Sequence, residues 1–491
     1  MAFPVARITE ALGAAGLLVE SRGALPESAS DITDDSRTAG TGSMFIAVRG
    51  SSHDGHDFLE QASANGAAMA IVEQPERTIL PTIVVRDGRR AAAVAAAAAF
   101  EHPSRQLEFA GVTGTNGKTT TVGILRHLLD AEETPAASIG TLGVLVGSAG
   151  EPMPGGAGLT TPGPVELQRV LRALADRGIR RIAMEVSSHS LDQRRVEGIV
   201  FKVGVFTNFT RDHLDYHESM ESYFNAKARL ISQLAPRGVA VVNSDDPAWR
   251  ALPPAPAFLT FGLGPDATLR AEAISYHSRG SEWRLTDGTQ RHSLQLPLIG
   301  DFNIMNTLAA AGAALQFGST LAEIAARLRT VPQVPGRLEI IHEPPTVLRD
   351  YAHTPDALER ALSAVRPFAR RKLIIVFGCG GDRDRGKRPV MGAIAERMSD
   401  HVILTSDNPR TEDPDEILDD IERGMRKSNH ERIEDRREAI ARALSVATRP
   451  DDVILLAGKG HETYQVRGTT RHPFDEQQIV RELVRNKRAP R

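Results

Sequence analysis

The glycine-rich segment GVTGTNGKTTT, residues 111–121, constrains the fold most strongly, because an apolar strand leads into it and an amphipathic helix follows it. Residues 107–112 have the pattern of a short strand, and the apolar residues between Val122 and Leu129 recur at helical spacing. Glycines permit a tight turn that brings backbone N–H groups close to an anion, and the N-terminus of the helix adds a partial positive charge. The segment therefore predicts a phosphate-binding loop made of Gly114, Thr115, Asn116, Gly117, Lys118, Thr119 and Thr120.

Two side chains give this loop the chemistry of a nucleotide site. Lys118 suits the β- and γ-phosphates of ATP, and the Thr119 hydroxyl suits the Mg²⁺ that accompanies ATP. The first glycine of the general pattern G-x-x-x-x-G-K-T falls on Val112, so a chance Gly-Lys-Thr in a turn is the alternative. The strand and the helix on either side favour the phosphate loop.

Composition narrows the class of protein. The 491 residues suffice for about three domains. With 62 acidic and 59 basic residues the net charge is −3, so we expect neither a nucleic-acid partner nor membrane insertion. Cys379 is the single cysteine, which excludes an internal disulfide and fits a reducing compartment, and we interpret it as structural. The N-terminal segment contains Arg7 and Glu10 and no signal-peptide pattern, so we expect a cytoplasmic protein.

Strands that end in polar loops recur from residue 108 to about 335, separated by helical segments. This alternation predicts an α/β domain with a parallel sheet, in which ligands bind beyond the carboxyl ends of the strands. Glu185 and His213 follow two such strands and could complete a Mg²⁺ site near Thr119. Lys227 lies in a helical stretch and, on the residues alone, is interpreted as a solvated surface lysine.

The regions on either side carry weaker signals. Residues 1–107 predict a small α/β domain, in which the loop containing Ser36 either is simply solvated or grips a polar ligand. Asn303 and Asn306 lie near the start of an alanine-rich helix, where they either cap the helix or meet a nucleotide base.

From residue 336 to 491, four more strand–loop units predict a second doubly wound domain. The loop GCGGDR lacks the third glycine of a dinucleotide fingerprint, since Arg383 occupies that position, so NAD binding is not favoured. Arg383 and Arg410 follow adjacent strands and could together bind a carboxylate or phosphate. Glu462 offers the opposite charge to an amine.

Eight motifs in this order resemble the Mur ligases of peptidoglycan synthesis. They are GTNGKTTT, EVSSHSLDQRR, TNFTRDHLDYH, GDFNIMN, DYAHTPDAL, GCGGDRDRGKR, DNPR and AGKGHE. The resemblance implies an α/β, three-domain Mur ligase architecture with a central P-loop ATPase domain and a Rossmann-like C-terminal domain. In that family the domains bind the UDP-linked substrate, ATP and the incoming amino acid, which here correspond to residues 1–107, 108–335 and 336–491.

The resemblance also implies roles for individual residues. It makes Lys118, Glu185, His213 and Lys227 catalytic, with Lys227 carbamoylated by CO₂ and Thr119, Glu185, His213 and Lys227 as metal ligands. It adds Asn303, Asn306, Arg337, Asp350 and His353 to the ATP site. It assigns Ser36, Thr160, Thr161, Ser187, Gln193 and Arg195 to the UDP-linked substrate, and Arg383, Asp407, Asn408, Pro409, Arg410, Gly458 and Glu462 to diaminopimelate. Ser51, Ser52, His53 and Leu159 depart from residues that some relatives place at uridine or peptide contacts.

The implied reaction joins meso-2,6-diaminopimelate to the D-glutamate of UDP-N-acetylmuramoyl-L-alanyl-D-glutamate at the expense of ATP, through an acyl phosphate. Three alternatives stay open: addition of L-lysine instead, a ligase like folylpolyglutamate synthase, and a P-loop nucleotide-binding switch without ligase activity. We also expect a monomer.

Overall fold

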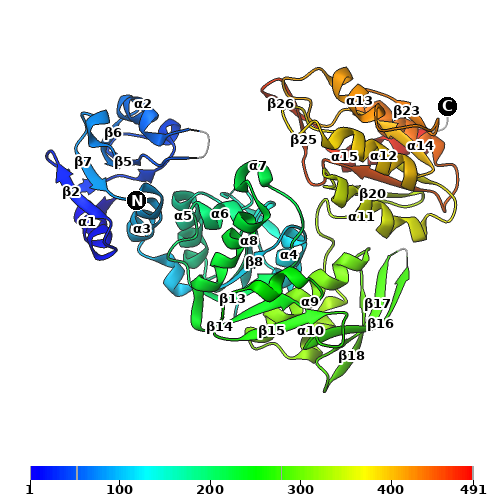
Figure 1. Cartoon of the computed structure of the whole chain (residues 1–491), viewed down its shortest axis with the longest axis horizontal. Coiled ribbons are helices and arrows are strands. Elements are labelled where there is room, and N and C mark those ends of the chain that lie inside the picture. Colours follow the sequence, from blue (N-terminus) through cyan, green and yellow to red (C-terminus); the bar gives the residue numbers. More distant parts are fainter. Residues whose placement is uncertain (1, 51–52, 157, 278, 489–491) are drawn as a thin grey trace. The chain divides into compact units, whose positions relative to one another are not determined.

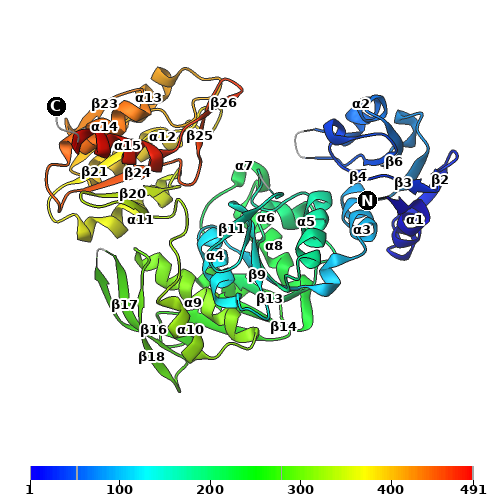
Figure 2. The ribbon, with the colours of Figure 1, turned by 180° about the vertical axis from the view of Figure 1, so that it is seen from behind.

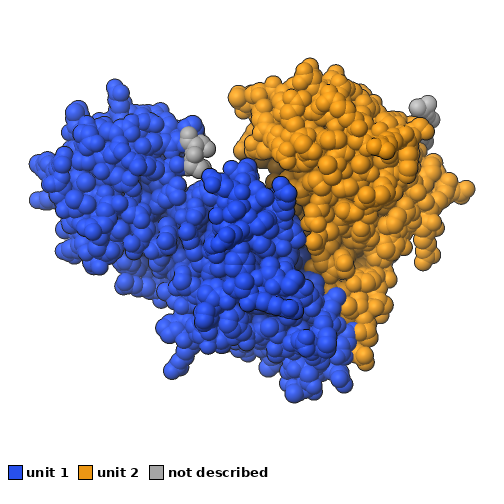
Figure 3. All heavy atoms as spheres, in the orientation of Figure 1, with its two compact units in different colours: residues 1–272, 285–292, 305–328 blue, residues 273–284, 293–304, 329–491 orange. Residues whose placement is uncertain are grey.

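The computed structural model describes residues 2–50, 53–156, 158–277 and 279–488, and these form two compact units (Figure 3). The first unit comprises residues 1–272, 285–292 and 305–328, and the second comprises residues 273–284, 293–304 and 329–491. The expected division at residues 107 and 335 is finer than this and stays a prediction.

The first unit opens with a small α/β layer (Figure 1). Its five-stranded sheet has the order β2-β7-β6-β5-β4, parallel except for the β2–β7 pair. A short pair, β1 (Phe3–Pro4) and β3 (Ser28–Ala29), lies outside this sheet. The elements are β2 (Leu18–Arg22), β4 (Ile32–Thr33), β5 (Ser43–Ile46), β6 (Ala67–Val72), β7 (Thr82–Val85), α1 (Val5–Ala14), α2 (Leu59–Ala64) and α3 (Gly88–Ala99). The predicted α/β character of this region is confirmed.

The larger sheet of the first unit carries the glycine-rich loop. Its strands have the order β11-β10-β9-β12-β8-β13-β14-β15-β16 and continue with β17 (Gly280–Thr286) and β18 (Arg291–Leu296). Pairing is parallel from β9 to β16 and antiparallel at β10 and β11. The strands are β8 (Glu108–Thr113), β9 (Ala136–Gly140), β10 (Gly143–Val146), β11 (Glu151–Met153), β12 (Arg181–Glu185), β13 (Phe201–Phe206), β14 (Leu234–Asn243), β15 (Phe258–Gly262) and β16 (Leu269–His277). Both β8 neighbours, β12 and β13, are parallel to it, so their carboxyl ends reach the same edge as the loop.

Helices cover this sheet and account for the predicted alternation (Figure 2). They are α4 (Lys118–Leu129), α5 (Pro164–Asp176), α6 (Ser188–Asp192), α7 (Leu214–His217), α8 (Met220–Ala228), α9 (Asp301–Gln316) and α10 (Leu321–Leu328). The boundary between the units passes through β16, through α9, and through the strands β17 (Gly280–Thr286) and β18 (Arg291–Leu296).

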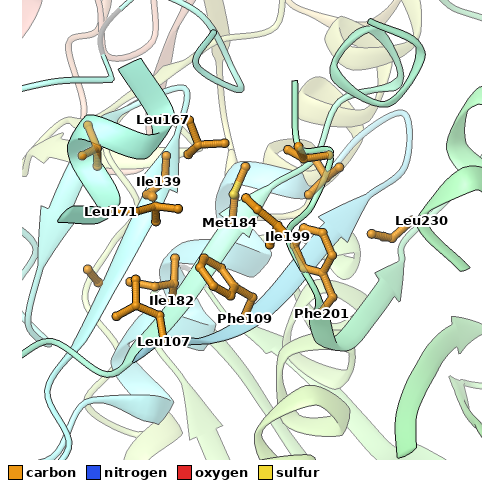
Figure 4. Packing of buried hydrophobic residues seen from close by; sticks show 14 of the residues in the cluster. Leu107, Phe109, Ile139, Leu167, Leu171, Ile182, Met184, Ile199, Phe201 and Leu230 are labelled. Atoms are coloured by element: carbon orange, nitrogen blue, oxygen red, sulfur yellow. The ribbon is translucent and has the colours of Figure 1, made fainter. Parts of the chain in front are cut away.

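Buried apolar side chains pack along the strands β8, β12 and β13 of this sheet (Figure 4). Phe109 of β8 meets Phe201 of β13 edge to face, with 6.1 Å between ring centroids. Leu167 and Leu171 of α5 belong to the same cluster. Burying a side chain of this size contributes about 1.5–3 kcal/mol, so the cluster stabilises the beginnings of β8 and β13.

The second unit contains a doubly wound sheet of order β19-β20-β24-β21-β22-β23, antiparallel only between β19 and β20. Its strands are β19 (Glu339–His342), β20 (Thr346–Asp350), β21 (Leu373–Phe377), β22 (His401–Leu404), β23 (His430–Arg432) and β24 (Val453–Ala457), followed by the hairpin β25 (Tyr464–Arg467) and β26 (Thr470–Pro473). Its helices are α11 (Pro355–Val365), α12 (Lys387–Met398), α13 (Pro414–Glu422), α14 (Arg436–Val446) and α15 (Glu476–Arg488).

Two separate cores show that both faces of this sheet are covered. One core contains residues of α11, α12 and α13, and the other contains residues of α14 and α15. The predicted second doubly wound domain is therefore confirmed. Cys379 is buried beside Met391, and burial raises the pKa of its thiol to about 12, which agrees with a structural role. Among the described residues, no helix is both long and apolar enough to cross a membrane.

Candidate active site

The glycine-rich loop joins the end of β8 to the start of α4, as the sequence predicts. Gly114 has φ +143°, and a Cβ there would lie 1.9 Å from Thr207 Oγ1. Gly117 has φ +83°, and a Cβ there would lie 2.2 Å from Asn306 Oδ1. Both positions therefore require glycine, for conformation and for space. Asn306 of α9 accordingly lies beside the loop, as expected for a residue of the ATP site.

The loop is held by the segment that follows β13. Asn208 accepts from the Asn116 N–H at 2.9 Å through Oδ1, and its Nδ2 donates to the Asn116 carbonyl at 3.1 Å. Its backbone carbonyl accepts from the Thr115 N–H at 2.8 Å, and the Thr207 hydroxyl donates to the Asn116 carbonyl at 2.7 Å. Sequence reasoning missed the roles of Thr207 and Asn208. They could have been predicted, because the segment TNFT follows a strand that neighbours β8 in a parallel sheet.

Lys118 is the first residue of α4, and its ammonium folds back over the loop. Nζ donates to the carbonyls of Gly114 at 3.0 Å and Thr115 at 2.8 Å. A positive charge is thus held above a turn whose following helix points its N-terminus at the same place. This combination suits a polyphosphate.

Thr119 and Glu185 meet under the loop, as the predicted metal site requires. The Thr119 hydroxyl donates to Glu185 Oε2 at 3.1 Å, and Glu185 Oε1 accepts from the Thr141 N–H at 2.8 Å. The Glu185 side chain is only 1% exposed. A buried carboxylate beside a hydroxyl is an all-oxygen donor pair, the kind that Mg²⁺ prefers.

Lys227 is 1% exposed, so its interpretation as a solvated surface lysine is wrong. The helix α8 turns this residue toward the loop, where Nζ donates to the Gly114 carbonyl at 2.7 Å and lies 4.4 Å from the ring centroid of Tyr223. Burial lowers the pKa of the Lys227 ammonium well below its usual range, and the charge of Lys118 lowers that pKa further. A single lysine in a short helix does not reveal whether its face of the helix is buried. The sequence alone therefore could not predict that Lys227 is buried.

His213 also lies near the loop, through Tyr223. The ring centroids of His213 and Tyr223 are 6.0 Å apart, and the Tyr223 hydroxyl is 3.2 Å from Thr115 Oγ1. Burial lowers the pKa of His213, so its imidazole is neutral at pH 7 and able to ligate a metal. Among the described residues, no group of three His, Cys, Asp or Glu side chains is arranged to hold a metal ion. The predicted metal site contains only two such side chains, Glu185 and His213. The donors otherwise expected are the Thr119 hydroxyl and a modified Lys227.

The residues expected to bind the UDP-linked substrate form a second network, next to Glu185. The Thr161 hydroxyl donates to the Glu185 carbonyl at 2.9 Å and accepts from the Ser187 N–H at 3.1 Å. Arg195 donates to the Thr161 carbonyl at 3.0 Å and to Gln193 Oε1 at 2.6 Å. Thr160 joins this network through the hydroxyl of Thr141, at 3.2 Å.

Ser36 lies in the smaller sheet region and is buried, with its hydroxyl donating to Gln61 Oε1 at 2.7 Å. The neighbouring Arg37 is exposed and pairs with Asp35, so only part of that loop is solvated. Ser51 and Ser52 lie outside the described residues, whereas Leu159 is exposed.

The other residues expected at ATP belong to the second unit. Asp350 Oδ2 accepts from the Leu338 N–H at 2.7 Å, and burial raises the pKa of its carboxyl to about 6 against the lowering effect of Arg337. The Arg337 guanidinium lies 4.7 Å from the ring centroid of Tyr351. His353 Nδ1 is 2.7 Å from the Tyr351 carbonyl oxygen. Asn303 donates to the Ile299 carbonyl at 2.7 Å.

The expected diaminopimelate residues gather where β21, β22 and β24 end. Arg410 Nη1 donates to the Gly381 carbonyl at 2.6 Å, and Arg383 Nη1 donates to the Asp382 carbonyl at 3.0 Å. Asn408 Nδ2 donates to Glu462 Oε2 at 2.8 Å. The Gly458 N–H donates to the Asp350 carbonyl at 3.0 Å, which joins this loop to the expected ATP residues of the same unit.

Two buried cations that sequence reasoning missed support these loops. Lys459 lies among Asp407, Asn408 and Glu462. Arg388 binds Glu412 with two parallel hydrogen bonds, both 2.9 Å, and donates to the Gly380 carbonyl at 3.3 Å. Both lie within the motifs GCGGDRDRGKR and AGKGHE, whose pattern does not show which of several charged residues is buried.

Known proteins match this chain along nearly its whole length. Three family profiles fit: "Mur ligase family, catalytic domain" at residues 30–112, "Mur ligase middle domain" at 112–314, and "Mur ligase, glutamate ligase domain" at 336–460. A Geobacillus kaustophilus protein called UDP-N-acetylmuramoyl-L-alanyl-D-glutamate–2,6-diaminopimelate ligase is 44% identical over 466 residues, which cover 92% of this chain and 94% of that protein. A Thermosynechococcus vestitus protein of the same name is 45% identical over 460 residues, covering 91% of each chain.

Solved structures agree on the fold. A structure described as the same diaminopimelate ligase superimposes with a TM-score of 0.66 at 34% identity, covering 96% of this chain and 98% of that one. A Mycobacterium tuberculosis folylpolyglutamate synthase with ADP and AMPPCP has a TM-score of 0.63 at 19% identity, covering 82% of this chain and 96% of that one, which shows a shared fold alone. The glycine-rich loop, the three α/β sheets and the relatives that match nearly the whole chain lead to one conclusion: the chain belongs to the Mur ligase family.

Proposed function

We propose that this chain is an ATP-dependent ligase that joins meso-2,6-diaminopimelate to the D-glutamate of UDP-N-acetylmuramoyl-L-alanyl-D-glutamate, in the cytoplasmic synthesis of peptidoglycan precursors. The observation that carries the proposal is the full-length match to relatives of that name, in a chain that places Arg410 and Glu462 in neighbouring loops of the second unit. We expect the enzyme to act as a cytoplasmic monomer.

The first chemical step needs the phosphate loop. The γ-carboxylate of the substrate's D-glutamate attacks the γ-phosphorus of ATP, forming an acyl phosphate and releasing ADP. Both partners are anionic, so positive charge must offset their repulsion. Lys118 above the loop and the N–H groups at the start of α4 are placed to supply it.

The second step forms the amide. An amine of diaminopimelate attacks the acyl carbon, and phosphate leaves as the tetrahedral intermediate collapses. The protein would contribute by holding the amine and the acyl phosphate in line. The reaction then takes place between two bound groups instead of requiring a bimolecular encounter. Arg383 and Arg410 would hold a carboxylate of the amino acid, and Glu462 would hold an ammonium.

The residues around Glu185 fit a Mg²⁺ ion, because they offer a buried carboxylate beside a hydroxyl. We assign the ion to Thr119, Glu185, His213 and a carbamoylated Lys227. The ion would neutralise developing charge on the phosphates. An ammonium cannot ligate a metal, whereas a carbamate oxygen can, and a lysine with a lowered pKa is partly the neutral amine that CO₂ requires.

Phosphate release from ATP tests this proposal against its rivals. The complete mixture should release phosphate, and leaving out either the UDP-linked dipeptide or the amino acid should abolish the sustained release. Steady hydrolysis that ignores both substrates would support a nucleotide switch instead. Turnover with a folate and glutamate would support a ligase like folylpolyglutamate synthase.

A further inference from the structure

Lys459 is a fully buried lysine in the loop between β24 and β25, and neither the family motifs nor the reaction gives it a role. Its ammonium donates to Asn408 Oδ1 at 3.0 Å and to Glu462 Oε2 at 3.3 Å. Asp407 Oδ1 lies 4.0 Å away. All three neighbours belong to the proposed amino-acid site, but a side chain with 0% exposure cannot itself touch the substrate.

The contacts of Lys459 determine how the Asn408 amide is turned. Asn408 Oδ1 accepts from Lys459 Nζ and also from the Val466 N–H at 2.9 Å. Asn408 Nδ2 donates to Glu462 Oε2 at 2.8 Å. Turning the amide over would face Nδ2 toward two donors and Oδ1 toward a carboxylate, so only one orientation satisfies every group.

The same contacts determine which oxygen of Glu462 is available. Among the described residues, Asn408 and Lys459 contact this carboxylate, and both do so at Oε2. Oε1 takes part in none of them, and the side chain is 16% exposed. One oxygen is thus held from inside the protein, and the other is left for a ligand.

The positive charge of Lys459 is needed to keep the Glu462 carboxylate in this position. Its ammonium stands between the carboxylates of Asp407 and Glu462. Without it, two buried or half-buried carboxylates would share a small region with no cation at their centre, and Glu462 would turn toward solvent or take up a proton. Either change would remove the anionic oxygen that an ammonium group needs.

We propose that Lys459 is a positioning residue that presents Glu462 Oε1 to an ammonium group of the amino-acid substrate. This inference rests on the proposed function and adds to it the group that sets the geometry of the amine site. Lys459 acts through Asn408 and Glu462 and makes no contact with the substrate.

The test is a double-mutant cycle on the full chain, with steady-state KM values for meso-diaminopimelate and for ATP. Lys459→Gln should raise the KM for diaminopimelate about 10- to 100-fold and leave the KM for ATP within about twofold. Glu462→Gln should do the same. The double variant should be no worse than Glu462→Gln alone, because both changes remove one interaction. Lys459→Arg, which keeps the charge, should give an intermediate KM.

Arg126→Gln is the matched control, since Arg126 is a buried cation of the first unit that donates to the Gly147 carbonyl and to Ser138 Oγ, away from the residues expected at the amino acid. It should lower Tm without a selective change in the KM for diaminopimelate. If Lys459→Gln does not fold, Lys459→Met takes its place in the cycle, because it fills a similar volume without a buried amide. Multiplicative effects in the double variant, or an equal KM change in Arg126→Gln, would overturn the positioning role while the proposed function stands. A wild-type chain that cannot use diaminopimelate would instead overturn the proposed function, and this inference with it.

Discussion

At the scale of single residues, a substitution of Lys118 should affect catalysis with little effect on folding. Its ammonium donates to carbonyls of the loop and its side chain is half-buried, so it is not a core group. Lys118→Ala should reduce kcat by at least about 10²-fold, the usual loss when a donor to a developing anion is removed. Tm should change by no more than about 2 °C. Lys202→Ala, which removes a partly exposed partner of Glu108, is the control and should keep full activity.

Lys227 carries the prediction about the carbamate. Lys227→Ala should lose most activity, and a short carboxylic acid such as acetate should restore part of it by supplying the missing oxygens. The activity of the variant is measured with and without the acid, and the wild type serves as the control for non-specific activation. A folded Lys227→Ala enzyme with normal turnover would rule out a required carbamate.

Arg410 carries the prediction about selectivity. Among the described residues, its guanidinium donates a hydrogen bond through Nη1, to the Gly381 carbonyl, so the other nitrogens are available to a substrate carboxylate. Arg410→Ala should raise the KM for meso-diaminopimelate by about 10²-fold or more and leave the KM for ATP nearly unchanged. Arg397→Ala, which removes an exposed arginine of α12 paired with Glu359, should change neither constant. Unchanged discrimination in Arg410→Ala would show that another group selects the amino acid.

At the scale of elements, the loop after β8 depends on its support from the end of β13. Asn208→Ala removes two side-chain hydrogen bonds to Asn116, each contributing about 1 kcal/mol. We expect a roughly tenfold rise in the KM for ATP and a fall in Tm of a few degrees, measured by kinetics and calorimetry. Asn65→Ala removes a comparable bond, to the Ser36 carbonyl, in the small N-terminal layer. It should lower Tm with no effect on the KM for ATP, and a similar KM change in both variants would contradict a specific role for Asn208.

The elements that sequence reasoning predicted well are those with a local pattern. The strand before Gly114 and the helix after Gly117 are visible in apolar periodicity and glycine positions, and β8 and α4 confirm them. The two doubly wound regions follow from the alternation of strands and helices for the same reason. Parallel order then brought Glu185 and the segment after β13 to the edge that carries the loop.

Interactions between residues far apart in the chain could not be predicted from the sequence. The burial of Lys227 depends on how α8 packs against Gly114, 113 residues earlier. The support from Asn208 and the cluster around Lys459 likewise join separate loops. Contacts of this kind produce no periodic pattern in the sequence. The motifs therefore predicted which segments form each site but not the contacts between their side chains.

At the scale of the whole molecule, two α/β units divide the expected chemistry between them. The phosphate loop, Glu185, His213, Lys227 and the expected contacts to the UDP-linked substrate belong to the first unit, and the expected amino-acid residues belong to the second. The family profiles follow this division in part, because the profile at 30–112 and most of that at 112–314 fall in the first unit and the profile at 336–460 falls in the second. The proposed enzyme therefore assembles its reaction from parts that fold around separate cores.

The choice of amino acid tests the proposed function most directly. Wild-type protein, ATP, Mg²⁺ and the UDP-linked dipeptide are mixed with equal concentrations of meso-diaminopimelate and L-lysine, and the two products are counted by mass spectrometry. L-lysine lacks the distal carboxylate and would leave guanidinium donors unpaired, so we predict an excess of the diaminopimelate product of about 10⁴-fold. Equal amounts of the two products, or an excess of the lysine product, would contradict the proposed function.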